Sequence, residues 1–185
     1  MSKGKEPNGK KTSKAKVKSK PFFTDERISF ITGILISGIA VYLLLACISY
    51  LFWWETDLSL ADSNVISNAD VNVKNWSGKS GHFLAKIIIG YGFGFGAFFI
   101  PLIFGTLGLY LLNFPKLKPW GIVVKMTFAV LILSLILGFV FGQSDGYLIS
   151  GPGGAQGSLI TRWLNAFMGK IGTGIVLALL TVSYL

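Results

Sequence analysis

Four long blocks of apolar residues constrain this chain more than any other feature of its sequence. Residues 28–54 contain no charged residue, residues 87–115 contain none, and residues 120–141 contain only Lys125. The fourth block, residues 171–185, is apolar throughout. A helix needs about 20 residues to cross the hydrocarbon core of a bilayer. The pattern therefore predicts an all-α, polytopic membrane protein with four transmembrane helices, the last of which is cut short at the end of the chain.

The composition argues against a soluble protein. Charged residues make up 14% of the chain, whereas a soluble domain carries about a quarter. A cleaved secretory signal peptide has an apolar region of about 7–15 residues followed by small residues. The first block is much longer and ends in Trp53-Trp54-Glu55, so we expect it to be retained as a membrane helix. The single Cys47 excludes a disulfide framework within the chain.

The pattern divides the chain into a basic tail and a membrane domain. Residues 1–24 are rich in Lys, Ser and Gly, so they cannot bury enough apolar surface to fold. Residues 25–185 are expected to form a four-helix membrane domain. Its predicted helices span residues 28–54, 83–112, 120–141 and 170–185, and its two outer loops span residues 55–82 and 142–169. Within the second loop, the apolar spacing of residues 158–168 predicts an amphipathic helix at the membrane surface, with Arg162 on its polar side.

The distribution of Lys and Arg predicts the orientation of the chain, because basic residues concentrate on the cytoplasmic side of membrane proteins. With the N-terminus inside, that side holds twelve basic residues, which are the nine of residues 1–27 and Lys116, Lys118 and Lys125. The outer side holds five, which are Lys74, Lys79, Lys86, Arg162 and Lys170. We therefore expect a cytoplasmic N-terminus. Because the last helix is about five residues short of a span, we also expect the natural protein to continue past Leu185 into the cytoplasm.

Four glycines lie at alternate positions in the second predicted helix, namely Gly90, Gly92, Gly94 and Gly96. They fit part of a dinucleotide-binding fingerprint, but that motif follows a β-strand and needs an acidic residue about 20 positions later. The apolar run meets neither requirement. Small residues four positions apart instead let membrane helices approach closely. On one continuous helix the glycines would mark two faces, one for a neighbouring helix of the same chain and one for a second subunit.

No residue pattern predicts catalysis, a cofactor or a metal ion in this segment. The glycine-rich residues 151–158 lack the Lys of a phosphate-binding loop. His82 is the only histidine, and no cysteine pair or carboxylate cluster accompanies it, so a catalytic triad and a metal site are both disfavoured. Charged residues inside membrane helices often mark transport paths. Lys86 and Lys125, however, lie within about a turn of the predicted helix ends, where their side chains can reach the membrane surface.

Three short motifs, taken in order, resemble one known family. The first is Asn75-Trp76-x-Gly78-x-x-Gly81 before the second helix, with Pro101 following inside that helix. The second is Gly153-Gly154-x-x-Gly157, and the third is Gly169-x-x-Gly172-Thr173 at the start of the last helix. Their order, together with the four spans, makes residues 25–185 similar to the N-terminal four-helix membrane domain of the FtsK/SpoIIIE family of bacterial DNA translocases.

The resemblance implies a membrane-anchoring and septum-targeting domain in the bacterial inner membrane. The implied motor lies beyond residue 185, uses ATP and Mg²⁺, and pumps double-stranded DNA during chromosome segregation. The implied partners are the lipid bilayer, division-site proteins and further copies of the chain, arranged as a hexamer. This segment itself is expected to hold no catalytic residue and no cofactor. The basic tail could touch either anionic lipid or DNA.

Two other functions stay open from the residues alone. One is a structural cell-division or envelope protein that has no motor. The other is a small transporter or channel subunit, which would need polar side chains facing a pore, and the predicted helices offer few.

Overall fold

The structure, a computed structural model, describes residues 26–59, 72–114, 118–142 and 146–185. These residues contain helices and turns but no strand. Four helical stretches are long and apolar enough to cross a membrane. The prediction of an all-α membrane protein with four spanning helices is confirmed, whereas the predicted tail at residues 1–24 lies outside the described residues.

The described helical segments follow one another along the chain without any intervening sheet. They are α1 (Glu26–Ser59), α2 (Gly78–Ala85), the π-helical η2 (Lys86–Phe93), the 3₁₀-helical η3 (Gly94–Phe98), α3 (Phe99–Leu111), α4 (Pro119–Phe141) and α5 (Gly154–Tyr184). The second of the four apolar stretches is thus made of α2, η2, η3 and α3 joined end to end.

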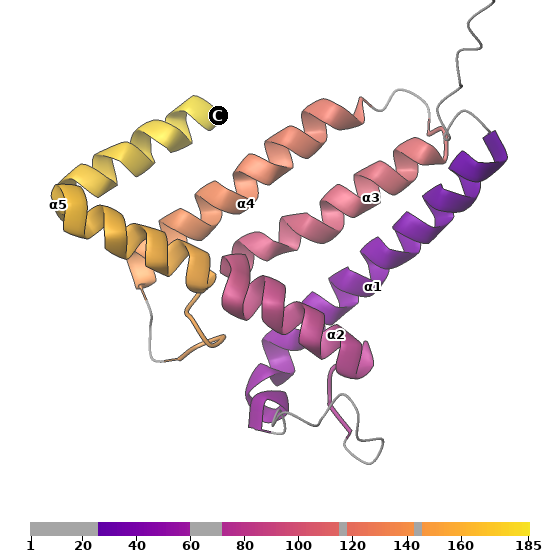
Figure 1. Ribbon diagram of the computed structural model, residues 1–185, viewed down its shortest axis with the longest axis horizontal. Helices are drawn as coiled ribbons and strands as arrows, with labels where there is room; N and C mark the ends of the chain where they lie inside the picture. Colours follow the sequence, from indigo (N-terminus) through magenta and orange to yellow (C-terminus); the bar gives the residue numbers. More distant parts are fainter. Residues whose placement is uncertain (1–25, 60–71, 115–117, 143–145) are drawn as a thin grey trace, which may run out of the picture.

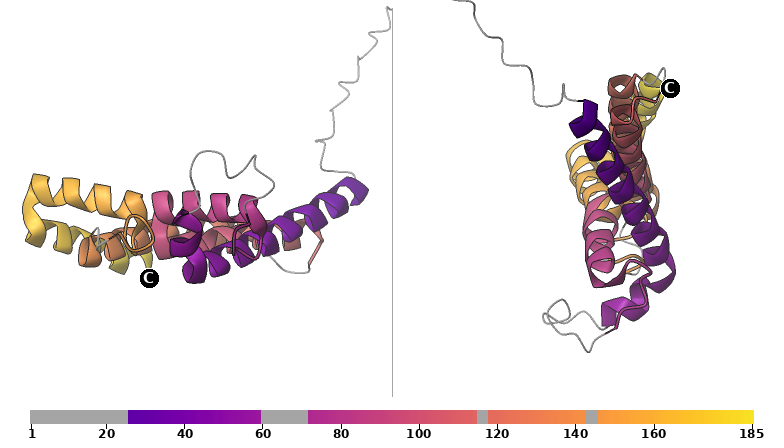
Figure 2. Two further views of the ribbon diagram at one scale, coloured as in Figure 1. Left: turned by 90° about the horizontal axis from the view of Figure 1, so that it is seen from below. Right: turned by 90° about the vertical axis from the view of Figure 1, so that its right-hand side faces the viewer.

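Three of these helices run alongside one another, with α3 between α1 and α4 (Figure 1). α2 with η2, and likewise the first half of α5, run across them at the end away from the start of α1 (Figure 1). We call this end the distal end. Seen from below, the two crossing segments follow each other in a row on one side of the molecule (Figure 2, left). We call residues 78–93 and 154–168 together the distal belt.

Local sequence explains where the long helices begin and end. Glu26 lies in the first turn of α1, where the positive end of the helix dipole favours an acid. Pro119 is the first residue of α4, a position at which its missing N–H costs no hydrogen bond. Gly142 follows α4 with φ 60°, and its N–H donates to the Gly138 carbonyl at 3.0 Å. Glycine is favoured there because it has no Cβ to oppose a positive φ.

The second apolar stretch is broken, and the prediction of one helix over residues 83–112 is wrong at this point. Gly92 has φ −96° and ψ −114°, and Gly94 has φ 59° and ψ −133°, neither of which is helical. The chain changes direction sharply here between the crossing segment and α3 (Figure 1). Only glycine adopts such angles at little cost. The two faces expected from alternate spacing on one helix therefore do not form.

The loop predicted at residues 142–169 contains the first half of α5, which begins at Gly154. Residues 158–168, for which the apolar spacing predicted a helix, are helical. Gly169 interrupts α5 with φ 77° and ψ 162°, and the second half turns back beside α4 (Figure 1). The reason for the turn is again a glycine in a conformation that other residues rarely adopt.

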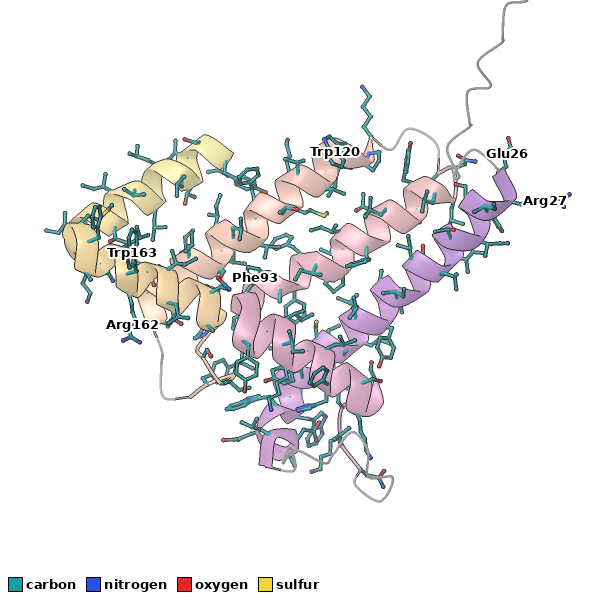
Figure 3. The ribbon with its side chains drawn as sticks, in the orientation of Figure 1. Glu26, Arg27, Phe93, Trp120, Arg162 and Trp163 are labelled. Carbon is teal, nitrogen blue, oxygen red and sulfur yellow. The ribbon has the colours of Figure 1, made fainter. Side chains whose placement is uncertain are left out.

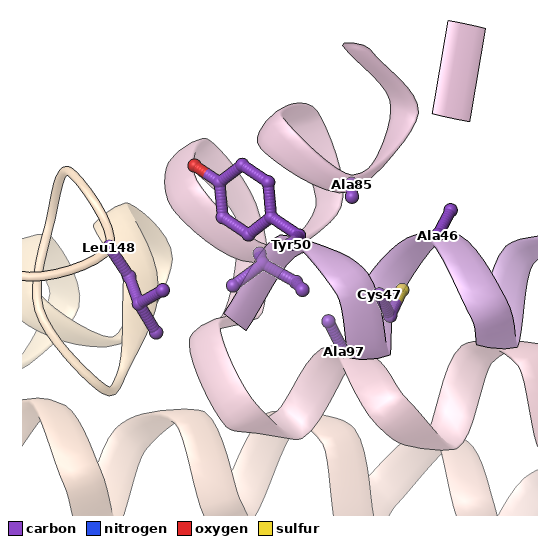
Figure 4. Close-up of a cluster of buried hydrophobic side chains, with 7 residues drawn as sticks. Ala46, Cys47, Tyr50, Ala85, Ala97 and Leu148 are labelled. Atoms are coloured by element: carbon purple, nitrogen blue, oxygen red, sulfur yellow. The ribbon is translucent and has the colours of Figure 1, made fainter. Parts of the chain in front are cut away.

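A cluster of buried apolar side chains lies at the distal end, where the belt meets α1. It consists of Ala46, Cys47, Tyr50, Ala85, Ile89, Ala97 and Leu148 (Figure 4). Elsewhere the spanning helices expose large apolar side chains such as Leu35 and Phe128. A soluble protein would bury these residues, whereas lipid tails solvate them in a membrane. The packing thus fits a protein whose outer solvent is a bilayer.

Small residues allow α1 and α3 to approach closely along their length. A Cβ built on Gly108 would meet the side chain and the backbone of Ser37 and lie 3.1 Å from the Gly33 carbonyl oxygen. Ser29 Oγ also donates to the Leu111 carbonyl at 3.0 Å. Membrane helices associate through such close backbone approach, because lipid tails leave no hydrophobic drive between helices.

Candidate functional site at the distal end

The first motif forms a tight junction between α1 and the distal belt. Asn75 is buried, and its amide Nδ2 donates to the Ala46 carbonyl on α1 at 3.1 Å. The side-chain Oδ1 of Asn75 accepts from the Ser77 N–H at 2.9 Å, and the backbone carbonyl oxygen of Asn75 accepts from the Gly78 N–H at 2.8 Å. The side chain therefore shapes the turn and fastens it to α1 at the same time. We call residues 72–81, with the part of α1 they contact, the first junction.

Asp57, near the end of α1, closes this junction from the other side. Its carboxylate is 1% exposed and accepts from the backbone N–H groups of Lys74 at 2.7 Å and Asn75 at 2.9 Å. His82 Nδ1 lies 3.6 Å from Asp57 Oδ2, and the His82 ring packs against Tyr50 with centroids 5.6 Å apart. Hydrogen bonds to a buried carboxylate are stronger than neutral ones. Asp57 is thus the strongest polar attachment in the first junction.

Hydroxyl groups of α1 hold the middle of the turn. Ser49 Oγ accepts from the Trp76 N–H at 2.9 Å. Tyr42 donates through its hydroxyl to the Ser77 carbonyl at 2.9 Å. The Trp76 ring itself is 62% exposed, so its backbone rather than its side chain is fixed. An exposed indole at the end of a membrane helix suits the headgroup level of a bilayer.

The two glycines of the first motif have different tasks. Gly78 starts α2 with φ 67°, a conformation that disfavours any other residue. Gly81 is buried, and a Cβ on it would fall on the Ser77 side chain and lie 3.3 Å from Ala46 Cβ. The first glycine thus sets the direction of the belt, and the second lets it lie close against α1.

The second motif forms a corresponding junction between α4 and α5, but through the backbone. Ser134 Oγ donates to the Gly153 carbonyl at 2.6 Å. A Cβ on Gly157 would fall on the Ser134 carbonyl oxygen, and one on Gly153 would meet the Gly138 N–H. These backbones therefore approach as closely as glycine allows. We call residues 151–157, with the Ser134–Gly138 turn of α4, the second junction.

The two parts of the distal belt touch end to end between the junctions. The Phe95 N–H donates to the Pro152 carbonyl at 2.9 Å. A Cβ on Gly94 would fall on that carbonyl, and a Cβ on Gly154 would fall on the Gly92 carbonyl. The break in the second stretch is therefore the place where the first half of the chain contacts the second half through backbone atoms.

The other predicted residues take varied places. A Cβ on Gly90 would lie 3.0 Å from the Ile149 side chain and 3.2 Å from the Leu148 carbonyl oxygen. Gly96 lies against the Val130 carbonyl on α4. Pro101 is buried near the start of α3. Thr173 is buried, and its Oγ1 donates to the Gly169 carbonyl at 3.0 Å, which stabilises the helix after the kink. A Cβ on Gly172 would meet only Met168 of the preceding turn.

A family model described as the 4TM region of DNA translocase FtsK/SpoIIIE matches residues 26–185. This match takes in all the described helices and both junctions. The chain belongs to the FtsK/SpoIIIE family. The resemblance seen in the three motifs is thereby confirmed, and the chain is a multi-pass membrane protein of that family. No curated protein and no solved structure matches it.

The glycine-rich loop of this FtsK/SpoIIIE membrane region is not shaped for a nucleotide. Gly153, Gly154 and Gly157 are each in contact with protein backbone, so the space that a phosphate would need is already filled. The loop also has no lysine, which a phosphate-binding loop uses to reach the phosphates. This loop therefore differs from a phosphate-binding loop both in sequence and in packing. Among the described residues, no group of three His, Cys, Asp or Glu side chains could hold a metal ion.

Several residues of the FtsK/SpoIIIE junctions were missed by the sequence analysis, namely Tyr42, Ser49, Asp57, Ser134 and Gly138. Three of them carry a readable signal. Ser134 and Gly138 are small residues four positions apart in an otherwise large-residue span, the spacing that favours close helix contact. Asp57 follows the aromatic group at the end of α1, where an acid needs a partner if it is to be buried. The partners themselves come from distant sequence.

Proposed function

We propose that this chain is the membrane-anchoring and septum-targeting domain of a DNA translocase that coordinates cell division with chromosome segregation. The observation that supports it is the family match over residues 26–185, which includes both distal junctions. In this proposal the segment anchors and positions the protein in the bacterial inner membrane and does not catalyse. Division-site proteins are its proposed partners.

The proposed orientation places the N-terminus in the cytoplasm and the distal end outside. The described basic residues at the other end, Lys118 and Lys125, then join the basic tail on the cytoplasmic side. Leu185 lies toward the same end of the molecule as the start of α1 (Figure 1). A motor joined after residue 185 would then share the cytoplasm with the chromosome. We propose that this motor uses ATP and Mg²⁺, acts on double-stranded DNA, and assembles as a hexamer.

Localisation in dividing cells tests the anchoring and targeting function. The chain, fused at its C-terminus to a fluorescent protein and expressed without any motor, is expected to gather at the division site. Uniform fluorescence around the membrane would contradict targeting, and fluorescence in the cytoplasm would contradict anchoring.

A matched pair of variants tests whether targeting depends on the second junction. Gly157→Leu should abolish the septal band, because it separates α4 from α5, whereas Gly38→Leu should keep it, because nothing lies within 4 Å of a Cβ at Gly38.

A further inference from the structure

The distal belt has an exposed apolar side on each of its two parts. On residues 78–93 this side carries Phe83, Ile87 and Tyr91, which lie four positions apart and therefore on one face. On residues 154–168 it carries Ile160, Trp163 and Phe167, which are 40%, 63% and 73% exposed. The rings of Trp163 and Phe167 stack with centroids 5.3 Å apart. Both parts thus present an ordered apolar surface that the rest of the described chain leaves uncovered.

Basic residues outnumber acidic ones on and beside the described belt. The basic residues there are Lys74, Lys79, Lys86, Arg162 and Lys170. Residues 72–114 and 146–185 contain no Asp or Glu. The described acids near the belt are Glu55, which is exposed, and Asp57, which is buried and held by two backbone N–H groups. The described residues of the belt therefore carry a net positive charge, which favours an anionic surface.

On the second part of the belt, charge and apolar character point in different directions. In Figure 3, Arg162 lies on the edge of α5 that faces away from the spans, and Trp163 lies on the edge nearer the second half of α5. On the first part, Lys86 Nζ lies 5.9 Å from the centroid of the Tyr91 ring, so the cation there lies beside the exposed aromatic ring rather than opposite it. An amphipathic helix with basic residues on one side and aromatic residues on the other lies in the plane of a membrane surface.

The direction of the belt agrees with that placement. Both parts run across α1, α3 and α4 rather than along them (Figure 1). A membrane crossed by these three helices would therefore have the belt lying in its plane. A protein partner would usually present acidic side chains in a defined pattern, whereas a lipid surface needs only the net charge and the apolar face seen here.

We propose that the distal belt binds anionic phospholipid headgroups and lies flat at the boundary between headgroups and acyl chains. Its basic residues contact lipid phosphates, and Trp163, Phe167 and their counterparts on the first part enter the acyl region. This binding would fix the depth of the distal junctions in the bilayer. It is independent of septal targeting, because it follows from the charge and shape of the belt alone.

Tryptophan quenching by brominated lipids tests the proposal. A variant that keeps Trp163 as its only tryptophan, made by Trp53→Phe, Trp54→Phe, Trp76→Phe and Trp120→Phe, is placed in nanodiscs as the full chain. Lipids brominated near the headgroup are expected to quench Trp163 more than lipids brominated near the chain end. At equal mole fraction, brominated phosphatidylglycerol is expected to quench more than brominated phosphatidylcholine, and added salt should reduce the difference.

Charge variants identify the source of the preference. Arg162→Gln with Lys170→Gln should lower the ratio of phosphatidylglycerol to phosphatidylcholine quenching toward one, since each cation near an anionic surface contributes roughly five-fold to the preference for anionic lipid. Arg162→Lys with Lys170→Arg should retain the ratio. The matched control, Lys118→Gln with Lys125→Gln at the opposite end, removes the same charge and should leave the ratio unchanged.

Three results would overturn the proposal. One is the absence of quenching by any brominated lipid, which would mean that water or protein covers Trp163. Another is equal quenching by the two headgroup classes in the parent protein, a comparison that stands even if a charge variant fails to fold. The third is an equal loss of preference in both double Gln variants, which would place the anionic lipid elsewhere.

Discussion

The two halves of this membrane domain make the same shape with different chemistry. In each half a spanning helix is followed by a belt segment that starts at a glycine with positive φ, Gly78 at 67° and Gly154 at 69°. A buried glycine follows three positions later, and the belt segment ends at a glycine, Gly94 or Gly169, that turns the chain into the next span. Each half of the chain therefore contributes one belt segment to the distal end, with glycines at corresponding positions.

The halves differ in what fastens the belt to the preceding span. In the first half, side chains do so, with Asp57, Asn75 and Ser49 forming hydrogen bonds across the junction. In the second half, backbone meets backbone, and Ser134 supplies one side-chain hydrogen bond. The first junction should thus be sensitive to loss of polar groups, and the second to gain of side-chain volume. Two junctions of similar shape can therefore be destabilised by different kinds of substitution.

The largest effect is expected from added volume in the second junction. Gly157→Leu would place side-chain atoms where the Ser134 backbone lies, so α4 and α5 would separate and the free energy of unfolding would fall by more than about 3 kcal/mol. Thermal unfolding in nanodiscs, followed by circular dichroism, measures this. Gly38→Leu on the lipid-facing side of α1 is the control and should change little. Equal stability of the two variants would show that the close approach is not needed.

Loss of the carboxylate should dominate the first junction. Asp57→Ala leaves the N–H groups of Lys74 and Asn75 buried without their acceptor, which should cost about 2–3 kcal/mol. The turn before α2 should also become sensitive to protease, because its main attachment to α1 is lost. Glu55→Ala, an exposed acid one half-turn away, is the matched control. If the two Ala variants unfolded alike, Asp57 would not be the attachment that we describe.

A smaller effect is expected from the one side-chain bond of the second junction. Ser134→Ala removes the hydrogen bond to Gly153 but keeps the backbone approach, so the free energy of unfolding should fall by only about 1 kcal/mol. Thr127→Ala, whose exposed hydroxyl bonds within its own helix turn, controls for loss of a hydroxyl in α4. A loss at Ser134 as large as that at Asp57 would remove the contrast between the halves.

The smallest expected effect is the coupling between the junctions. Asp57 and Ser134 share no hydrogen-bond partner, so Asp57→Ala and Ser134→Ala should be additive to within roughly 0.5 kcal/mol. The double variant and both single variants, unfolded under one condition, give this value. Strong coupling would mean that the end-to-end contact at Gly94 and Pro152 transmits strain between the halves.

The sequence was sufficient for the spans but not for the contacts between them. Apolar blocks predict spanning helices because each helix satisfies its own backbone in lipid. The break at Gly92 and Gly94 was not predicted, because the residue that requires it, Pro152, lies in the other half of the chain. The same spacing of glycines would suit a straight helix or a broken one.

The junctions were predictable as motifs but not as structures. Asn75 and Gly157 stand out by pattern, yet their partners on α1 and α4 are ordinary residues such as Ala46 and Ser134. The Ala46 and Ser134 carbonyl oxygens are backbone atoms, which any residue carries, so residue type does not mark these contacts. The hydroxyls of Ser49 and Ser134 and the carboxylate of Asp57 do depend on residue type, but their partners lie far away in the sequence.

Cysteine labelling across residues 154–168 tests the central claim, that the distal belt lies flat along the outer face of the membrane that the four spans cross. In a Cys47→Ala background, single cysteines replace Arg162 and Ala166 on one side of the helix and Ile160 and Phe167 on the other. A maleimide that cannot cross membranes should label Arg162→Cys and Ala166→Cys from outside intact cells and leave Ile160→Cys and Phe167→Cys unlabelled. Equal labelling of all four positions, or labelling only after the membrane is permeabilised, would contradict it.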